Sequence, residues 1–452
     1  MKGMTNAQKD VSDLATKSEL AQKADQSDLV ALQNTVANVP TREEFETLKN
    51  DVMGSILIKD TLESATLAVT KTSSGTQVYS GNVVPTSIQV GNGQYTVVIS
   101  QFGETHSKTI TVLGETYLDL SSDIVTVTPQ TDAISWTIND VAMPMESVKV
   151  LKGITKTVRT VFGSWPDGND ICASGSISFS SDLTIRQIYS EPYIITASGK
   201  FVAPLTKTYQ VVLTGGGGGG GGGTAGASYY NEDYLQTGYY GGPGGYGGQG
   251  GVVTAIEIEL SKNSSTQVTI GKGGDGGAMG TYDSSASDPI SDYRGKVGRD
   301  GGGTTFGTTS CNGGKGGSTG YISFDEYFGE GGDGGIGGNG SNSSTLHLFD
   351  YTVNYGSGGN GGRGSTTSGS APGSGTSGEK CNSKIDWLSN VGNGGNGGKG
   401  GSMYKGGSGG TGGYGFNQYG VGGTGGNGGD SEENGTNGTR GSDGAVAIRV
   451  VL

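Results

Sequence analysis

Catalysis by this sequence would depend on very few side chains. The sequence contains only two histidines, His106 and His347, so a Ser-His-Asp or histidine-metal site would require one of them. His106 is expected in a turn between two strands, and His347 in a loop. The carboxylates of Asp325, Glu326 and Asp350 could supply the acid–base pair of a glycan hydrolase, but acidic loop residues are more often solvated charges. We therefore predict that the protein is not an enzyme and has no metal or cofactor.

Recognition through aromatic loops is the second chemistry that the sequence offers. Fifteen of the 21 tyrosines follow Gly215, and most lie in loops that also contain Ser, Gly and Asn. Tyrosine provides a large, rigid contact area at a small entropy cost, and aromatic rings beside Asp or Asn suit sugars. The alternative is that these rings cap a glycine region with little core of its own. The loops are 227–240, 279–298, 318–330, 341–355 and 366–391.

Glycine dominates the part of the chain that carries these loops. Nine consecutive glycines occupy Gly215–Gly223, and 79 of the 92 glycines lie at or after Gly215. The repeating unit is GGxGGx, which differs from the Gly-X-Y period of collagen. A flexible linker is one interpretation of this composition. A calcium-binding repeat is another, but GGDGG at 273–277 and 331–335 lacks the large apolar residue that should follow the aspartate.

A packed array of polyproline-II-type helices is the third interpretation, and we favour it. Such a helix has three residues per turn and no internal hydrogen bonds, so its backbone groups can bond to neighbouring helices. Close packing requires glycine where backbones meet, and GGx leaves one direction free for a side chain that points to solvent or to an edge. The runs TYQVVL, VVTAIEIEL, TQVTIG and AVAIRVVL flank the glycines and can pair into a sheet that holds both ends of the tract.

The chain before the glycines is predicted to contain three further segments. Residues 1–55 carry apolar residues at 3-4 spacing, as in a coiled-coil seam that self-associates. Thr41 and Glu44 can form a capping box at the start of a helix. The alternative for this segment is a helical hairpin packed on the next domain.

Short alternating runs follow and predict two small β-sandwich modules, at 56–121 and 122–197, with Trp136 in the core of the second. The glycine-rich tip is residues 198–452. The predicted fold class is therefore mainly β and irregular, with an N-terminal coiled-coil helix, two β-sandwich modules, and packed polyproline-II-type helices closed by a small β-sheet.

Charge and cysteine content limit the partners of this chain. The net charge of −13 argues against non-specific binding to nucleic acid or to anionic lipid. The cysteines Cys172, Cys311 and Cys381 form no CxxC motif, so we expect them to be reduced, with a Cys311–Cys381 bridge as the alternative. The sequence has neither a signal-peptide core nor an apolar run of membrane-spanning length. We expect synthesis in a host cytoplasm and no membrane insertion.

Residues 198–452 resemble the glycine-rich domain at the tips of phage tail fibres and in detachable tail-fibre adhesins. The resemblance rests on the order of GKFVAP, a strand and polyglycine, the segments VTIGKGGDGG and RDGGGTTFG, and the terminal GAVAIRVVL. The N-terminal segment also looks like that of fibre proteins. The two sandwich modules are absent from those adhesins, so the middle third of the chain is not covered.

The resemblance implies a protein of the virion, in a tail fibre or tail tip, that binds a receptor on the bacterial surface. The receptor would be a glycan or a surface protein, and other tail or baseplate proteins would hold the N-terminus of a homotrimer. The alternatives are a structural virion protein without a receptor role and a bacterial surface adhesin. The predicted receptor-binding residues are Tyr229, Tyr230, Asp233, Tyr234, Tyr239, Tyr240, Asp325, Tyr327, Phe328, His347, Phe349, Asp350 and Tyr351.

Overall fold

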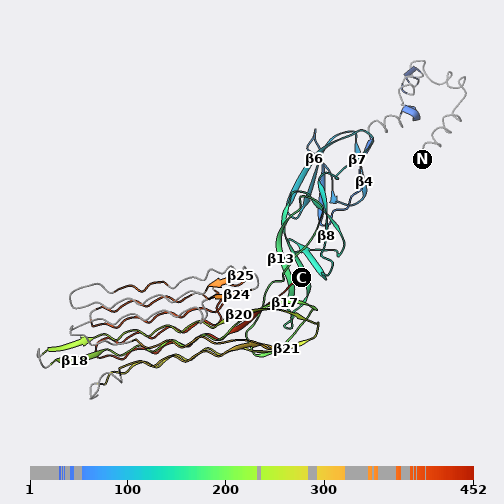
Figure 1. Ribbon diagram of the computed structural model, residues 1–452. Coiled ribbons are helices and arrows are strands. Elements are labelled where there is room, and N and C mark those ends of the chain that lie inside the picture. Colours follow the sequence, from blue (N-terminus) through green and yellow to red (C-terminus); the bar gives the residue numbers. More distant parts are fainter. Residues whose placement is uncertain are drawn as a thin grey trace. The chain divides into compact units, whose positions relative to one another are not determined.

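The fold is mainly β, as predicted, in a computed structural model whose described residues form 26 strands (Figure 1). No described helix is long and apolar enough to cross a membrane. The structure describes residues 53–231, 236–283, 293–320, 373–377, 387–389, 391–392, 394–402 and 404–452, with a few residues between 30 and 44 and the backbone of 345–348 and 351–354. Side chains of 229–231 and 236–240 are not described.

The chain divides into two compact units that interleave in sequence. The first contains residues 1–129, 138–156 and 176–185, and the second contains the remainder. Strands β9, β12 and β13 each contribute residues to both units. The division into four segments along the sequence remains a prediction.

Seven strands of the first unit form two sheets, in the orders β4-β1-β7 and β3-β2-β5-β6. Alternate residues are buried, including Leu67 and Val69 of β2 and Val97 and Ile99 of β5, which confirms the predicted period of two. His106 lies within β6 and pairs with Ile99, so the expectation that it lies in a turn is wrong. The strands are β1 (Met53–Ile58), β2 (Ala65–Lys71), β3 (Gln77–Asn82), β4 (Thr86–Gly91), β5 (Gly93–Gln101), β6 (Glu104–Val112) and β7 (Glu115–Leu118).

Two more sheets follow, in the orders β11-β8-β14 and β10-β9-β12-β13. Trp136, in β9, is 1% exposed, as expected of a core residue. The strands are β8 (Ile124–Thr128), β9 (Ser135–Ile138), β10 (Val141–Met143), β11 (Val148–Leu151), β12 (Thr155–Ser164), β13 (Asp170–Ser178) and β14 (Leu183–Thr184).

The second unit carries the glycine segments on two four-stranded sheets. Their orders are β15-β26-β17-β20 and β16-β21-β22-β23. Three of the four predicted flanking strands share the first sheet, whereas TQVTIG lies in β21 and belongs to the second. The strands are β15 (Tyr193–Ile195), β16 (Gly199–Val202), β17 (Lys207–Thr214), β20 (Val253–Leu260), β21 (Ser265–Thr269), β22 (Thr304–Phe306), β23 (Thr309–Cys311) and β26 (Ala445–Val450).

A hydrophobic core between these strands holds the sheets of the second unit together. The buried side chains of Phe201, Tyr209, Phe306 and Ile448 belong to it. Phe201 packs edge-on against Tyr209, with ring centroids 6.1 Å apart. Because β26 lies between β15 and β17, the strand that follows all the glycine segments completes the sheet from which they start.

The predicted capping box near the N-terminus is confirmed. The Thr41 N–H and hydroxyl both donate to Glu44 Oε2, at 2.8 and 2.9 Å, and the Glu44 N–H donates to Thr41 Oγ1 at 3.2 Å. These bonds lower the pKa of the Glu44 carboxyl. Helical residues are described at 30, 31, 33, 35 and 42–44. The rest of the predicted coiled coil lies outside the described residues.

Shortening Ile448 tests how far the tip depends on β26. Ile448 is fully buried, and we expect Ile448→Ala to lower the free energy of unfolding of the second unit by about 2–5 kcal/mol. Ile188 is 63% exposed, so Ile188→Ala should change it by less than about 0.5 kcal/mol. Urea titration followed by tryptophan fluorescence measures both. Equal effects of the two substitutions would mean that the stability of the second unit does not depend on the packing of β26.

Candidate functional site: the glycine segments and their hairpins

Residues 215–226, which we term the central segment, follow β17 directly and have every backbone N–H bonded. Consecutive N–H groups donate in turn to three different segments, 243–252, 293–302 and 433–442. The fourth N–H returns to the first partner segment, three residues earlier along it. In one such series, the N–H groups of Gly216, Gly219, Gly222 and Ala225 donate to the carbonyls of Gly302, Arg299, Lys296 and Tyr293 at 2.7–2.9 Å.

The carbonyls of the central segment bond to three further segments. Gly216, Gly217 and Gly218 accept from the N–H groups of Gly314, Gly274 and Gly423, each at 2.7–2.8 Å. The same segments return three residues later, at Gly317, Gly277 and Gly426. Six segments therefore surround the central one, and bonding repeats every three residues, the period of a polyproline II helix.

The consecutive glycines are required by this packing. A Cβ atom placed on any residue from Gly215 to Gly223 would lie less than 3.0 Å from a backbone carbonyl of a neighbouring segment. At Gly220, for example, the obstructing carbonyl is that of Thr424. Because the obstruction is backbone, no side-chain movement relieves it. The alternative interpretation as a flexible linker does not fit residues whose N–H groups are all bonded.

Polar side chains cap the N–H groups at the margins of the array. The Thr424 N–H donates to Thr439 Oγ1 at 2.7 Å, and the Asn427 N–H donates to Thr436 Oγ1 at 2.6 Å. Similar caps join Asn396 to Thr411, Lys399 to Ser408 and Val421 to Ser442. The x residues of GGx therefore do more than point to solvent, because Ser and Thr there replace a missing neighbour.

Adding one methyl group to the central segment tests the packing. We expect Gly220→Ala to destabilise the second unit by about 1–3 kcal/mol, because the new Cβ overlaps the Thr424 carbonyl. Lys315→Ala is the matched control, since Lys315 is an exposed x residue. Limited proteolysis and thermal unfolding report the difference. If the Gly220→Ala chain resists protease and heat as well as the control does, the flexible-linker interpretation is favoured instead.

The first set of predicted site residues lies in a hairpin that begins where the central segment ends. Strands β18 (Ala227–Asn231) and β19 (Gln236–Tyr240) are antiparallel. Tyr229 pairs with Gly238, Tyr230 with Thr237, Ser228 with Tyr239 and Ala227 with Tyr240. Asp233 and Tyr234 lie outside the described residues. This hairpin marks what we term the distal end of the array, opposite the sheet that contains β17 (Figure 1).

The second hairpin lies at the other end of the array. Strands β24 (Thr345–Leu348) and β25 (Tyr351–Asn354) pair His347 with Thr352 and Leu348 with Tyr351, and β24 contacts β20 of the sheet (Figure 1). Twelve residues separate β17 from β18, a span of about 37 Å at the polyproline II rise. Of the remaining predicted residues, Asp325, Tyr327, Phe328, Phe349 and Asp350 lie outside the described part of the chain.

Two tyrosines that sequence analysis did not single out support the distal hairpin. The rings of Tyr282 and Tyr293 stack with centroids 5.7 Å apart, and the hydroxyls of Tyr282 and Ser228 are 3.3 Å apart. Tyr293 is 4% exposed, packs with Ala225 and Ala227, and donates its hydroxyl to the Asp283 carbonyl. Tyr293 therefore caps the glycine array, as the alternative interpretation of the tyrosines expects.

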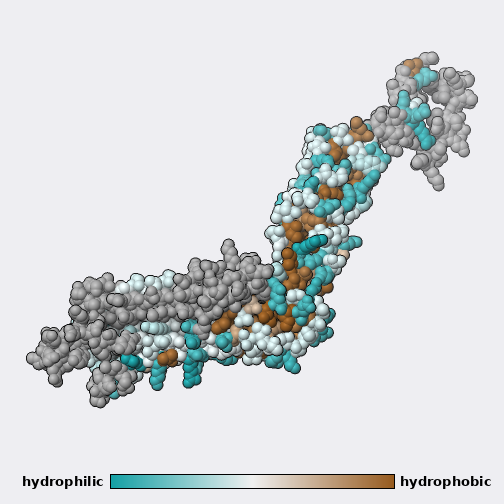
Figure 2. All heavy atoms as spheres, viewed as in Figure 1, coloured by the Kyte–Doolittle hydropathy of each residue, from teal (hydrophilic) through white to brown (hydrophobic). Residues whose placement is uncertain are grey.

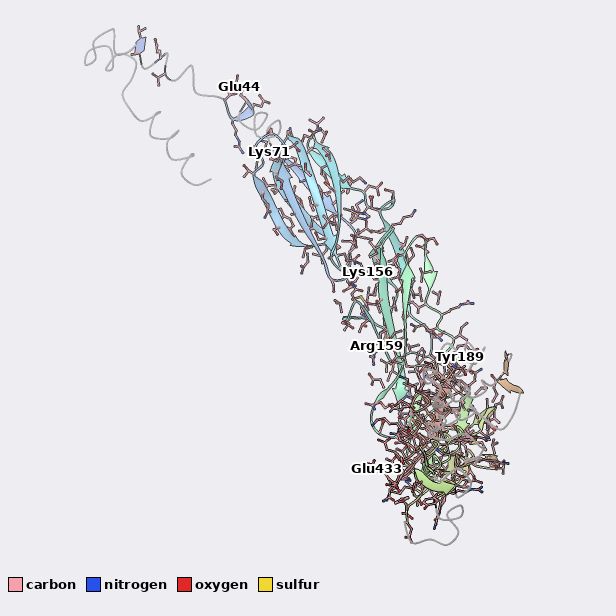
Figure 3. The ribbon with its side chains drawn as sticks, turned by 90° about the vertical axis from the view of Figure 1, so that its left-hand side faces the viewer. Glu44, Lys71, Lys156, Arg159, Tyr189 and Glu433 are labelled. Carbon is pink, nitrogen blue, oxygen red and sulfur yellow. The ribbon has the colours of Figure 1, made fainter. Side chains whose placement is uncertain are left out.

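An arginine of β26 joins the sheet to the aromatic rings of Tyr189 and Trp387. The Arg449 guanidinium lies 3.7 Å from the centroid of the Tyr189 ring and 4.7 Å from that of Trp387. Its Nε donates to Gln210 Oε1 at 2.8 Å, and Gln210 Nε2 donates to Glu257 Oε1 at 2.5 Å. Figure 3 labels Tyr189 beside the densely packed glycine region. These contacts stabilise the sheet end.

Within the described part of the chain, no three His, Cys, Asp or Glu side chains are close enough to hold a metal ion. No protein-family model matches this sequence, and comparison with curated proteins finds no match. Function is therefore inferred from the geometry of the glycine segments and of the hairpins at their two ends.

Cys311 is free and 5% exposed, beside the first glycines, and Cys172 is also free. The Cys311–Cys381 bridge is therefore not formed, and Cys381 lies outside the described residues. Burial raises the pKa of the Cys311 thiol to about 12. Cys311 Sγ lies 3.7 Å from the Thr304 carbonyl oxygen, to which the thiol donates.

Alkylation measures this burial. From the pKa of about 12 against the usual 9.0, we expect a thiolate fraction at pH 8 roughly a thousandfold below that of an exposed cysteine. In a Cys381→Ser chain, iodoacetamide should modify Cys311 only after denaturation, as mass spectrometry of the peptide would show. Rapid labelling of the native chain would mean that the sheet end of the array opens.

Proposed function

We propose that this chain is a receptor-binding protein of a phage tail fibre or tail tip, which attaches the virion to a bacterial cell-surface receptor. The observation that carries the proposal is the array of bonded glycine segments that ends in an aromatic hairpin about 37 Å from its sheet. We further propose that the glycine segments are polyproline-II-type helices and that the two groups of sheets before them are sandwich spacers.

Rigidity is what suits this array to recognition. A loop held in its bound conformation loses little entropy on association, so more of its contact energy appears as affinity. The β18–β19 hairpin is continuous with the central segment, whose N–H groups are bonded on three sides. Its four tyrosines, Tyr229, Tyr230, Tyr239 and Tyr240, therefore stand on a rigid support.

The remaining parts of the proposal concern assembly and location. The capping box of Thr41 and Glu44 supports a helix in the N-terminal segment, which we propose forms a homotrimer and joins other tail or baseplate proteins. The array has no need of a catalytic centre or cofactor in this role. A structural virion protein without receptor contact and a bacterial surface adhesin are the competing outcomes of the test below.

Alanine substitution in each hairpin tests which end of the array contacts the host. Single changes of Tyr229, Tyr230 and Tyr234 probe the distal hairpin, and Phe349 and Tyr351 probe the other. We expect at least one distal change to weaken adsorption of the purified chain to host cells by about 2 kcal/mol, or roughly thirtyfold, as at an interface hot spot.

Tyr117→Ala is the control, because Tyr117 is 52% exposed in the first unit, under the Lys59 ammonium. Protease resistance verifies that each variant folds. Loss of adsorption in the Phe349 or Tyr351 variants alone would move the site to the sheet end. Unchanged adsorption of all five folded variants, with a loss in Tyr117→Ala, would move it to the first unit. Unchanged adsorption of every variant would favour the structural role.

A further inference from the structure

One lateral face of the glycine array combines exposed cations with backbone N–H groups that have no partner among the described residues. Three neighbouring segments, 272–280, 293–302 and 312–318, form what we term the basic face. The first two are joined by N–H groups of Lys296, Arg299 and Gly302 that donate to the carbonyls of Ala278, Asp275 and Lys272 at 2.7–2.8 Å. The segments after β21 run along the lower edge of this region in Figure 1, and hydrophilic side chains project there in Figure 2.

The cations of this face recur at a fixed step. Lys272, Arg299 and Lys296 stand at successive three-residue steps of the paired segments, which places them about 9 Å apart along the face at the polyproline II rise. Among residues 271–283 and 293–318 the charged side chains are Lys272, Arg294, Lys296, Arg299 and Lys315 against Asp275, Asp283 and Asp300, a net +2. The whole chain carries −13.

These cations are only partly neutralised by their neighbours. Lys272 pairs with Asp443 at 2.9 Å, and Arg299 lies 3.8 Å from Asp275, with side chains 82% and 67% exposed. An ion pair that exposed is weak and readily exchanges its partner. Lys296 has no ion pair with any described residue.

Backbone donors on the same face are also uncapped. The N–H groups of Lys272, Asp275 and Ala278 have no hydrogen-bond partner among the described residues, although their carbonyls are bonded. In other paired segments of the array, Thr and Ser hydroxyls cap the equivalent N–H groups, for example those of Thr424 and Asn427. The basic face therefore presents a row of amide donors beside its row of cations.

We propose that the basic face binds a linear acidic polysaccharide, laid along the segments with one carboxylate or phosphate at each step. Donors and cations at a repeat of about 9 Å suit anions separated by about two extended sugar rings. Duplex DNA carries one charge per roughly 1.7 Å of its axis, which is far denser than this row. The net charge of −13 repels polyanions in general, so the binding is local to this face.

This site is separate from the hairpins of the proposed receptor contact, so either can fail alone. The probe is surface-bound hyaluronate, which has one carboxylate per disaccharide, beside carboxyl-reduced hyaluronate and duplex DNA. We expect the full chain to bind hyaluronate at low salt and to lose this binding as the salt concentration rises. It should not bind the carboxyl-reduced polymer. Lys296→Glu combined with Arg299→Glu should weaken binding at least about tenfold, through the loss of two charge-assisted contacts.

The matched control is Lys399→Glu combined with Lys405→Glu, the same charge change on segments whose N–H groups are capped. The control should keep its binding, and both variants should keep protease resistance. Absence of hyaluronate binding, equal loss in the control, equal binding of the reduced polymer, or tighter binding to DNA would each overturn the proposal. The hairpin variants should bind hyaluronate normally, whatever their adsorption to cells.

Discussion

Satisfaction of backbone hydrogen bonds without a ladder of paired strands is the constraint on which the tip depends. Buried N–H and C=O groups must find partners, and in the central segment each consecutive residue finds its partner on a different neighbour. That requires six neighbours, and close approach excludes a Cβ atom at every position from Gly215 to Gly223. The entropy that glycine loses on folding is offset by these bonds, which a Cβ atom at Gly215–Gly223 would obstruct.

The sheet sets the alignment of the array. Thr214, the last residue of β17, pairs with Val253 of β20 and with Ala445 of β26. After Thr214 the chain leaves the sheet beside segments 243–252 and 433–442, which precede β20 and β26 and accept N–H groups of the central segment. The register of the sheet therefore sets the register of the array. Thr214 is fully buried, and its hydroxyl reaches the Gly215 and Gly251 carbonyls. It therefore fixes the point where a two-residue period changes to a three-residue one.

The sequence predicts much of the local structure and little of the pairing. Alternating apolar residues revealed the strands of both units, Thr41 and Glu44 revealed their cap, and GGx revealed a period of three. The neighbours of the central segment were not predictable, because every GGx triplet offers the same glycines. Which segments become neighbours also decides that β21 belongs to a second sheet and that the two hairpins lie at opposite ends of the array. Tyr293 looked like any loop tyrosine, since nothing local distinguishes a cap from a contact residue.

The order in which the central segment and its neighbours are made has a consequence for biosynthesis. Residues 215–226 emerge from the ribosome first, whereas their acceptors extend as far as Ser442. Until about two hundred further residues have been translated, by the spacing of those positions, one third of the N–H groups of the central segment are bonded only to water. The tip cannot fold domain-by-domain from its N-terminal side during translation. It closes only after segment 433–442 has been made, around a central segment that left the ribosome about two hundred residues earlier.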